Sequence, residues 1–170
     1  METVEKNFLA WLTVLYRDNP YIVQSLFDDI TDDLEDADRI GECDCEWVIV
    51  SLQSVALDES HYAYINHWDI NWDKCNYDDW LDDKLSAMWQ RFHFKPNWAD
   101  YYKEDFICED DNLPIEPFLR FLKQQFAIHG AELFAYEHFD GSWFLLVVPI
   151  MDKKDFIEAS KNWGLVDWFE

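Results

Sequence analysis

An Asp-Gly pair at residues 140–141 separates two strand-like runs near the C-terminal end of the chain. The runs cover residues 132–139 and 142–150. An Asp-Gly pair between two such runs is a strong signal for a tight β-hairpin turn, because its residues tolerate the positive φ that the turn requires. Residues 143–148 (WFLLVV) are all apolar, which is typical of a strand covered on both faces. The sequence therefore predicts an antiparallel hairpin whose second strand is central in its sheet.

Apolar residues recur with helical spacing in residues 4–16 and 22–30. Asn19-Pro20 lies between these segments, and we expect Asn19 to cap the second helix and Pro20 to be its first residue. The two segments should form an N-terminal helical hairpin. Three further helices are predicted: one capped by Asn76 and stopped by Lys95-Pro96-Asn97, one from Pro114 to a glycine cap at Gly130, and a short one from Asp152 or Lys153 to Gly164.

Other segments complete the expected fold. The runs 47–55 and 61–66 are predicted strands, and 165–169 is a predicted last edge strand. Residues 28–46 are interpreted as a helix end followed by an acidic loop. This order predicts a single α+β domain over residues 1–170, with helices packed on a small, mostly antiparallel sheet.

The charge of the chain restricts its partners. It has 36 acidic and 13 basic residues, a formal net charge of −23, and 25 of the acids lie in residues 28–116 with only 6 bases. Phosphate groups would be repelled, which excludes direct binding of nucleic acid and disfavours anionic membranes. Ten tryptophans argue against a disordered acidic chain. We therefore expect the region 28–116 to bind a basic protein.

The first residues and the cysteines indicate the compartment. Residues 1–11 lack the pattern of a signal peptide, and no apolar run reaches membrane-spanning length, so a cytoplasmic location with reduced cysteines is expected. The only close cysteine pair is Cys43-x-Cys45, which is not the usual spacing of a structural zinc site. The sequence predicts no metal and no cofactor.

Two Asp-rich runs, 78–83 and 32–36, contain a DDxxD pattern that can share Mg²⁺ ions. Asp78 and Asp79, however, fall in the first turn of a predicted helix, where carboxylates favour the helix dipole, and the run 32–36 is expected in a loop. Motifs of zinc proteases, serine hydrolases and phosphate loops are absent from the sequence. His129 is interpreted as a helix-terminal residue. We expect no enzymatic activity, and a metal-dependent enzyme is the least favoured alternative.

Acidic residues alternate with aromatic residues in the middle of the chain. Residues 67–73 (HWDINWD) place two tryptophans four apart, with two aspartates four apart beside them. Aromatic rings anchor interfaces, and neighbouring carboxylates pair with Lys and Arg of a partner. Such dense like charges also repel one another, and a basic partner would relieve this repulsion. The predicted contact residues are Trp68, Asp69, Trp72, Asp73, Asp78, Asp79, Asp82, Asp83, Glu104, Asp105, Glu109, Asp110 and Asp111.

The order of short motifs resembles a known group of proteins. A CEWVIV run at 45–50 precedes an acidic helix, Leu113-Pro114 opens a helix that closes at Gly130, and an LVVP run at 146–149 precedes KDFI at 154–157. This order resembles acidic bacterial domains without established activity and the small acidic immunity proteins of toxin systems, including contact-dependent inhibition. The resemblance implies a bacterial, non-enzymatic inhibitor of a protein toxin.

Two functions remain open at this point. The favoured one is an immunity protein that neutralises a basic toxin, with a nuclease as the expected toxin because nuclease sites are lined with cations. The alternative is a DNA mimic whose carboxylates replace phosphates on a DNA-binding protein. A mimic should bind several unrelated DNA-binding proteins, whereas an immunity protein should bind one toxin. The oligomeric state is not indicated by the sequence.

Overall fold

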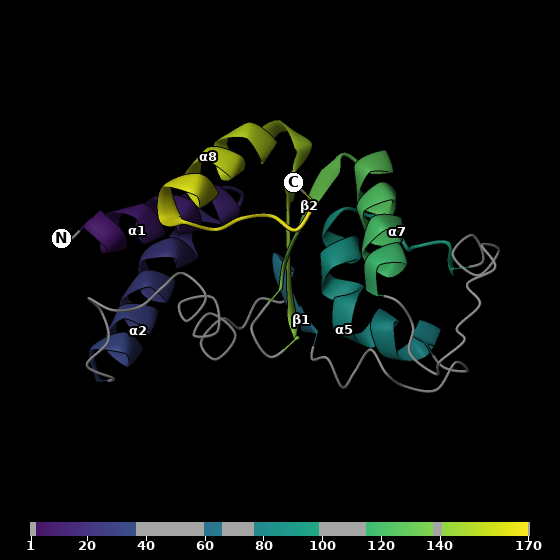
Figure 1. The fold of residues 1–170 in the computed structure, drawn as a ribbon, viewed down its shortest axis with the longest axis horizontal. Coiled ribbons are helices and arrows are strands. Elements are labelled where there is room, and N and C mark those ends of the chain that lie inside the picture. Colours follow the sequence, from purple (N-terminus) through teal and green to yellow (C-terminus); the bar gives the residue numbers. More distant parts are fainter. Residues whose placement is uncertain (1–2, 37–59, 66–76, 99–114, 138–140, 170) are drawn as a thin grey trace. The chain divides into compact units, whose positions relative to one another are not determined.

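The computed structural model describes residues 3–36, 60–65, 77–98, 115–137 and 141–169 (Figure 1). Across these residues it has five α-helices, two short 3-10 helices and three strands, which confirms the α+β class. They form two compact units, the first built from α1, α2 and α8 and the second from α5, α7 and the sheet. A single domain over residues 1–170 stays a prediction. Within the described part of the chain, no helix is both long and apolar enough to cross a membrane.

The first unit begins with the predicted helical pair. It comprises α1 (Thr3–Leu15), η1 (Pro20–Ile22), α2 (Val23–Asp36) and α8 (Lys153–Trp163). Aromatic rings fill the space between α1 and α8: the Trp11 and Trp163 ring centroids are 4.7 Å apart, and those of Phe8 and Trp163 are 5.1 Å apart. Both rings of α1 are buried, so this cluster is the core of the unit.

Two expectations about α2 are corrected. Asn19 and Pro20 do occupy the cap and first positions of a helix, but this helix is the short η1 that precedes α2, and the side chain of Asn19 makes no capping hydrogen bond; the N–H of Ile22 bonds to the backbone carbonyl of Asn19. Helix α2 also continues to Asp36, so the acidic run 32–36 is helical and not a loop. Residues 37–46 of the interpreted acidic loop and the predicted strand 47–55 lie outside the described residues.

The sheet of the second unit confirms the predicted hairpin. Its strands are β1 (Tyr62–Ile65), β2 (Ala131–Glu137) and β3 (Trp143–Pro149), all antiparallel, in the spatial order β1-β3-β2. β3 is therefore central, and its first six residues are buried, as the apolar run predicted. Strand β1 confirms the run predicted at residues 61–66.

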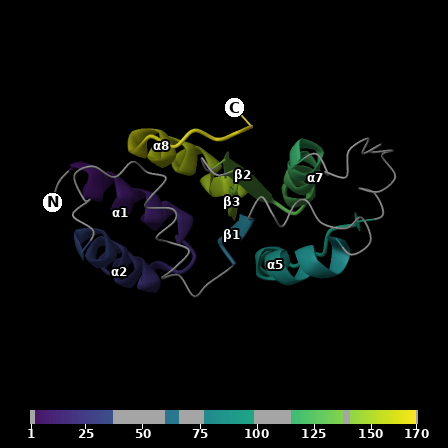
Figure 2. The same cartoon turned by 60° about the horizontal axis from the view of Figure 1, so that its bottom comes forward.

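Helices α5 (Tyr77–Arg91) and α7 (Ile115–Ile128) belong to the same unit (Figure 2). The segment that follows α5 packs on α7 through aromatic contacts: the ring centroids of Phe94 and Phe126 are 5.1 Å apart, and Trp98 stacks on Phe118. The Nη1 atom of Arg91 donates a 2.9 Å hydrogen bond to the carbonyl of Val147, which ties α5 to the central strand.

Helix ends follow the expected chemistry with two exceptions. Gly130 (φ +77°) and Gly164 (φ +95°) adopt the left-handed conformation expected of helix C-caps. Helix α5, however, ends at Arg91 and not at Lys95, because His93 takes a left-handed φ of 58° and the N–H of Phe94 bonds back to Trp89. The predicted strand at 165–169 is absent from the described residues, since the N–H of Leu165 closes the cap of α8 by bonding to Ser160.

Candidate functional site

The segment η1–α2 presents an exposed face that combines acids with a tyrosine. Its inner residues, which include Leu26 and Ile30, are buried, so the helix has a clear outer side. Tyr21 is 93% exposed. The outer side also carries three exposed aspartates, and we call these four residues the α2 face: Tyr21, Asp28, Asp29 and Asp32.

The charge on α2 opposes the stability of the helix itself. Its sequence, VQSLFDDITDDLED, has six acids and no base. Asp28 and Asp32 are like charges four residues apart, and acids in the last turns oppose the helix dipole. Only part of this cost is offset locally, where Gln24 Nε2 donates a 2.7 Å hydrogen bond to Asp28 Oδ1. The acidity of α2 is therefore not explained by the folding of the helix.

The predicted contact residues are only partly placed. Asp78, Asp79, Asp82 and Asp83 belong to the first seven residues of α5, where 78 and 82 are four apart, as are 79 and 83, so each pair shares a face. The structure describes the backbone of these four residues and not their side chains. The remaining predicted contact residues lie outside the described residues: Trp68, Asp69, Trp72, Asp73, Glu104, Asp105, Glu109, Asp110 and Asp111.

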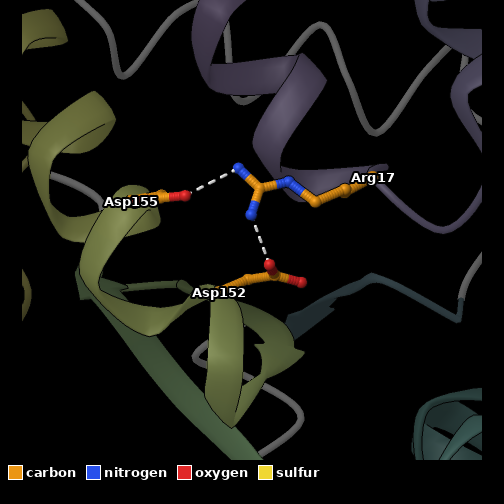
Figure 3. Close-up of polar contacts among 3 residues, drawn as sticks. All are labelled: Arg17, Asp152 and Asp155. Carbon is orange, nitrogen blue, oxygen red and sulfur yellow. Dashed lines mark hydrogen bonds and ion pairs between the residues drawn. The ribbon is translucent and has the colours of Figure 1, made fainter.

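A charged clamp fastens α1 to α8 (Figure 3). Arg17 lies just beyond the C-terminal end of α1 and donates to Asp152, which immediately precedes α8, and to Asp155 in its first turn, at 2.9 Å for the second bond. The hydrogen bond to Asp155, together with Asp152, raises the pKa of Arg17. Every charge also lies at the helix end that its sign favours. The clamp has a structural role, since it fastens together α1 and α8 of the unit that carries the α2 face.

Sequence analysis did not find this clamp or the α2 face. The signals were present, because acids before a helix and bases after one are favoured by the dipole. Arg17 and Asp152 are, however, 135 residues apart, and nothing in one sequence pairs them. The α2 face was missed because the run 32–36 had been interpreted as a loop.

The structure brings together no metal site in the part of the chain that it describes: no three His, Cys, Asp or Glu side chains cluster there. His129 directly follows α7, is exposed, and stacks on Phe94 with ring centroids 4.2 Å apart. Its position agrees with the interpretation of a helix-terminal residue. The absence of metal, cofactor and catalysis stays a prediction.

No family model matches this chain, and neither a curated protein nor a solved structure matches it.

Proposed function

We propose that this chain is an immunity-type inhibitor that binds a basic protein toxin in the cytoplasm and neutralises it. The toxin is proposed to be a nuclease, since the groove that holds its phosphate substrate is cationic. The inhibitor uses acidic side chains and no cofactor. The resemblance to small acidic immunity proteins and the charge of −23 both support this proposal.

One observation carries the proposal most directly, namely the composition of the α2 face. Tyr21 projects 93% of its surface into solvent next to a helix that has six acids and no base. A tyrosine buried in an interface supplies a large rigid contact at low entropic cost, and carboxylates beside it pair with arginine or lysine. The exposed tyrosine and the acidic charge would both contribute to binding in a complex, whereas neither stabilises the isolated helix.

The charge also defines how binding proceeds. A dense acidic surface steers a cationic partner during encounter and raises the association rate at low salt. Salt weakens this steering because charges farther apart than the Debye length are screened. The predicted contact residues of α5 and of the segments 67–73 and 104–111 are also proposed to bind the toxin. Bound in this way, the inhibitor covers or distorts the substrate groove of the toxin.

The test uses the basic protein encoded by the reading frame next to this one, purified and mixed with the inhibitor. D28N/D29N/D32N removes three negative charges from α2 without changing side-chain size. We expect association to slow by about tenfold at low salt, since electrostatic steering accounts for one or more decades of association rate. Far-UV circular dichroism verifies that the variant is folded.

A matched control separates a defined face from bulk charge. E116Q/E137Q/E158Q removes three negative charges from exposed positions outside α2. If the α2 face is the contact, this control associates at nearly the rate of the wild type. Equal slowing by both triple variants would show that only net charge matters. Equal binding to several unrelated DNA-binding proteins would instead identify the chain as a DNA mimic.

A further inference from the structure

Helix α2 is anchored to the first unit through residues 23–30. The ring of Phe27 packs on Phe8 of α1, with ring centroids 5.8 Å apart. Beyond Ile30, Thr31 is half-buried and Asp32 is exposed. The buried side chains that the structure describes on α2 are Val23, Leu26, Phe27 and Ile30. Apolar burial therefore stabilises the first part of the helix, and Ile30 is the last of the described side chains to contribute to it.

Thr31 marks a point where the backbone of α2 is weakened. Its hydroxyl donates a 2.8 Å hydrogen bond to the carbonyl of Phe27 and a 3.0 Å hydrogen bond to the carbonyl of Asp28. In an α-helix these carbonyls accept hydrogen bonds from the N–H groups of residues 31 and 32. A threonine hydroxyl that shares such carbonyls slightly destabilises the helix and often bends it. Helix α2 can therefore open at Thr31.

The last residues of α2 carry charge that opposes helix formation. Residues 32–36 (DDLED), which we call the acidic end of α2, include four acids and no base. Carboxylates in the last turn of a helix are repelled by the negative end of its dipole, and salt screens this repulsion. Asp32 is also four residues from the like charges of Asp28 and Asp36. The charge of this segment therefore favours the unwound state.

We propose that the acidic end of α2 is a charge-sensitive segment, which unwinds beyond Thr31 at low ionic strength and is helical when cations screen its carboxylates or pair with them. The structure shows the helical state. The proposed function gives this transition a role, because a cationic toxin surface would supply the missing charges and complete the helix on binding. Only this role depends on the proposed function, since the transition itself can be measured without a toxin.

NMR chemical shifts of the Cα atoms measure the helical fraction of each residue in the full chain. Raising NaCl from about 0.01 M to about 1 M shortens the Debye length from about 30 Å to about 3 Å. We expect the helical fraction of residues 32–36 to rise about twofold or more, because several unfavourable charges are screened together, while residues 23–30 stay unchanged. Helix α7 is the internal control, since its one acid lies in the first turn, and it should not respond.

An oligolysine peptide, added at about 0.01 M NaCl, is the probe for pairing with a cationic partner. It should raise the helical fraction of residues 32–36 as salt does, and it should leave α7 unchanged. A rise with oligolysine in a chain that fails to inhibit the neighbouring basic protein would contradict the proposed function and support the charge-sensitive segment. No rise with either salt or oligolysine would overturn the charge-sensitive segment.

Two triple variants, each of which removes three negative charges, separate local charge from net charge. D32N/D33N/D36N should be helical at residues 32–36 already in about 0.01 M NaCl. E116Q/E137Q/E158Q, changed at exposed positions outside α2, should behave as the wild type. If the first variant does not fold, D36N replaces it and should show a smaller rise in the same direction. An equal change in both triple variants would overturn the proposal, because net charge alone would then control the segment.

Discussion

The indole Nε1 of Trp11 donates a 3.1 Å hydrogen bond to Oγ of Ser160, although 149 residues separate the two in the chain. Both side chains are buried, and the bond crosses from α1 to α8. It gives the large apolar ring of Trp11 a partner for its one polar atom. The first helix and the last helix are therefore joined by chemistry as well as by packing.

S160A should destabilise the first unit because it removes the acceptor from a buried indole N–H. We expect a loss of about 1–3 kcal/mol in the free energy of unfolding. Urea titration followed by tryptophan fluorescence measures the change. S25A, at an exposed position of α2, is the control and should change little. Equal stability of S160A and the wild type would contradict the role assigned to this bond.

R17Q tests the clamp between α1 and α8. Removing the guanidinium leaves Asp152, whose side chain is only 10% exposed, without this cationic partner. Exposed ion pairs contribute about 1 kcal/mol or less, and we expect a loss of this order because Arg17 and Asp155 are half exposed. A thermal melt of R17Q that coincides with the wild type in low salt would count against the clamp.

The pH dependence of the clamp follows from the raised pKa of Arg17, caused first by its hydrogen bond to Asp155. A cation whose pKa is raised in the folded state stabilises fully below its unfolded pKa and loses this effect only as pH rises through the folded value. The unfolded value is the ordinary arginine pKa, far above neutrality. The stability difference between wild type and R17Q should therefore stay constant from about pH 6 to pH 9. A difference that vanishes in alkaline solution below pH 9 would refute this explanation.

Two ion pairs made by basic residues of α7 should respond differently to the loss of one partner. Lys123–Glu132 includes a nearly buried carboxylate, whereas both partners of Arg120–Glu116 are more than half exposed. K123M removes the cationic partner of this nearly buried carboxylate and should cost about 3–5 kcal/mol of unfolding free energy. R120M should cost about 0.5 kcal/mol or less. Chemical denaturation of the two variants compares them, and similar losses would contradict the burial argument.

Gly164 tests whether backbone conformation alone ends α8. A Cβ atom at this position meets nothing within 4 Å, so G164A introduces no clash, but its φ of +95° is unfavourable for alanine. We expect a loss of about 1–2 kcal/mol. G164N should lose less, because asparagine tolerates left-handed φ values. Thermal denaturation gives the order, and G164A at least as stable as G164N would show that the cap conformation does not matter.

Local signals predicted most of the fold. The Asp-Gly turn and the apolar run of β3 identified the hairpin, and Gly130 and Gly164 marked two helix ends, because each depends on neighbouring residues only. The end of α5 was misplaced because the left-handed φ of His93 ends the helix before Lys95-Pro96-Asn97 is reached. Leu165 was expected in a strand, but its N–H is used by the cap of α8.

The candidate site was less predictable for a physical reason. In the sequence, the exposed Tyr21 of the candidate site looks the same as an aromatic residue of the core. The two differ only in burial, and burial depends on where α1 and α8 pack in the folded protein. The clamp of Arg17 and the contact between Lys123 and Phe169 join residues distant in sequence. A single sequence does not show which distant residues will contact each other, whereas its charged residues can be counted directly.

The most direct test of the proposed function is a titration of the neighbouring basic protein, assayed for nuclease activity, with increasing amounts of this chain. If the chain inhibits the toxin as proposed, nuclease activity falls linearly to zero at a fixed stoichiometric ratio. Y21A/D28N/D32N, folded by circular dichroism, should require a clear excess to reach the same inhibition. Full nuclease activity at saturating amounts of the wild-type chain would contradict the account.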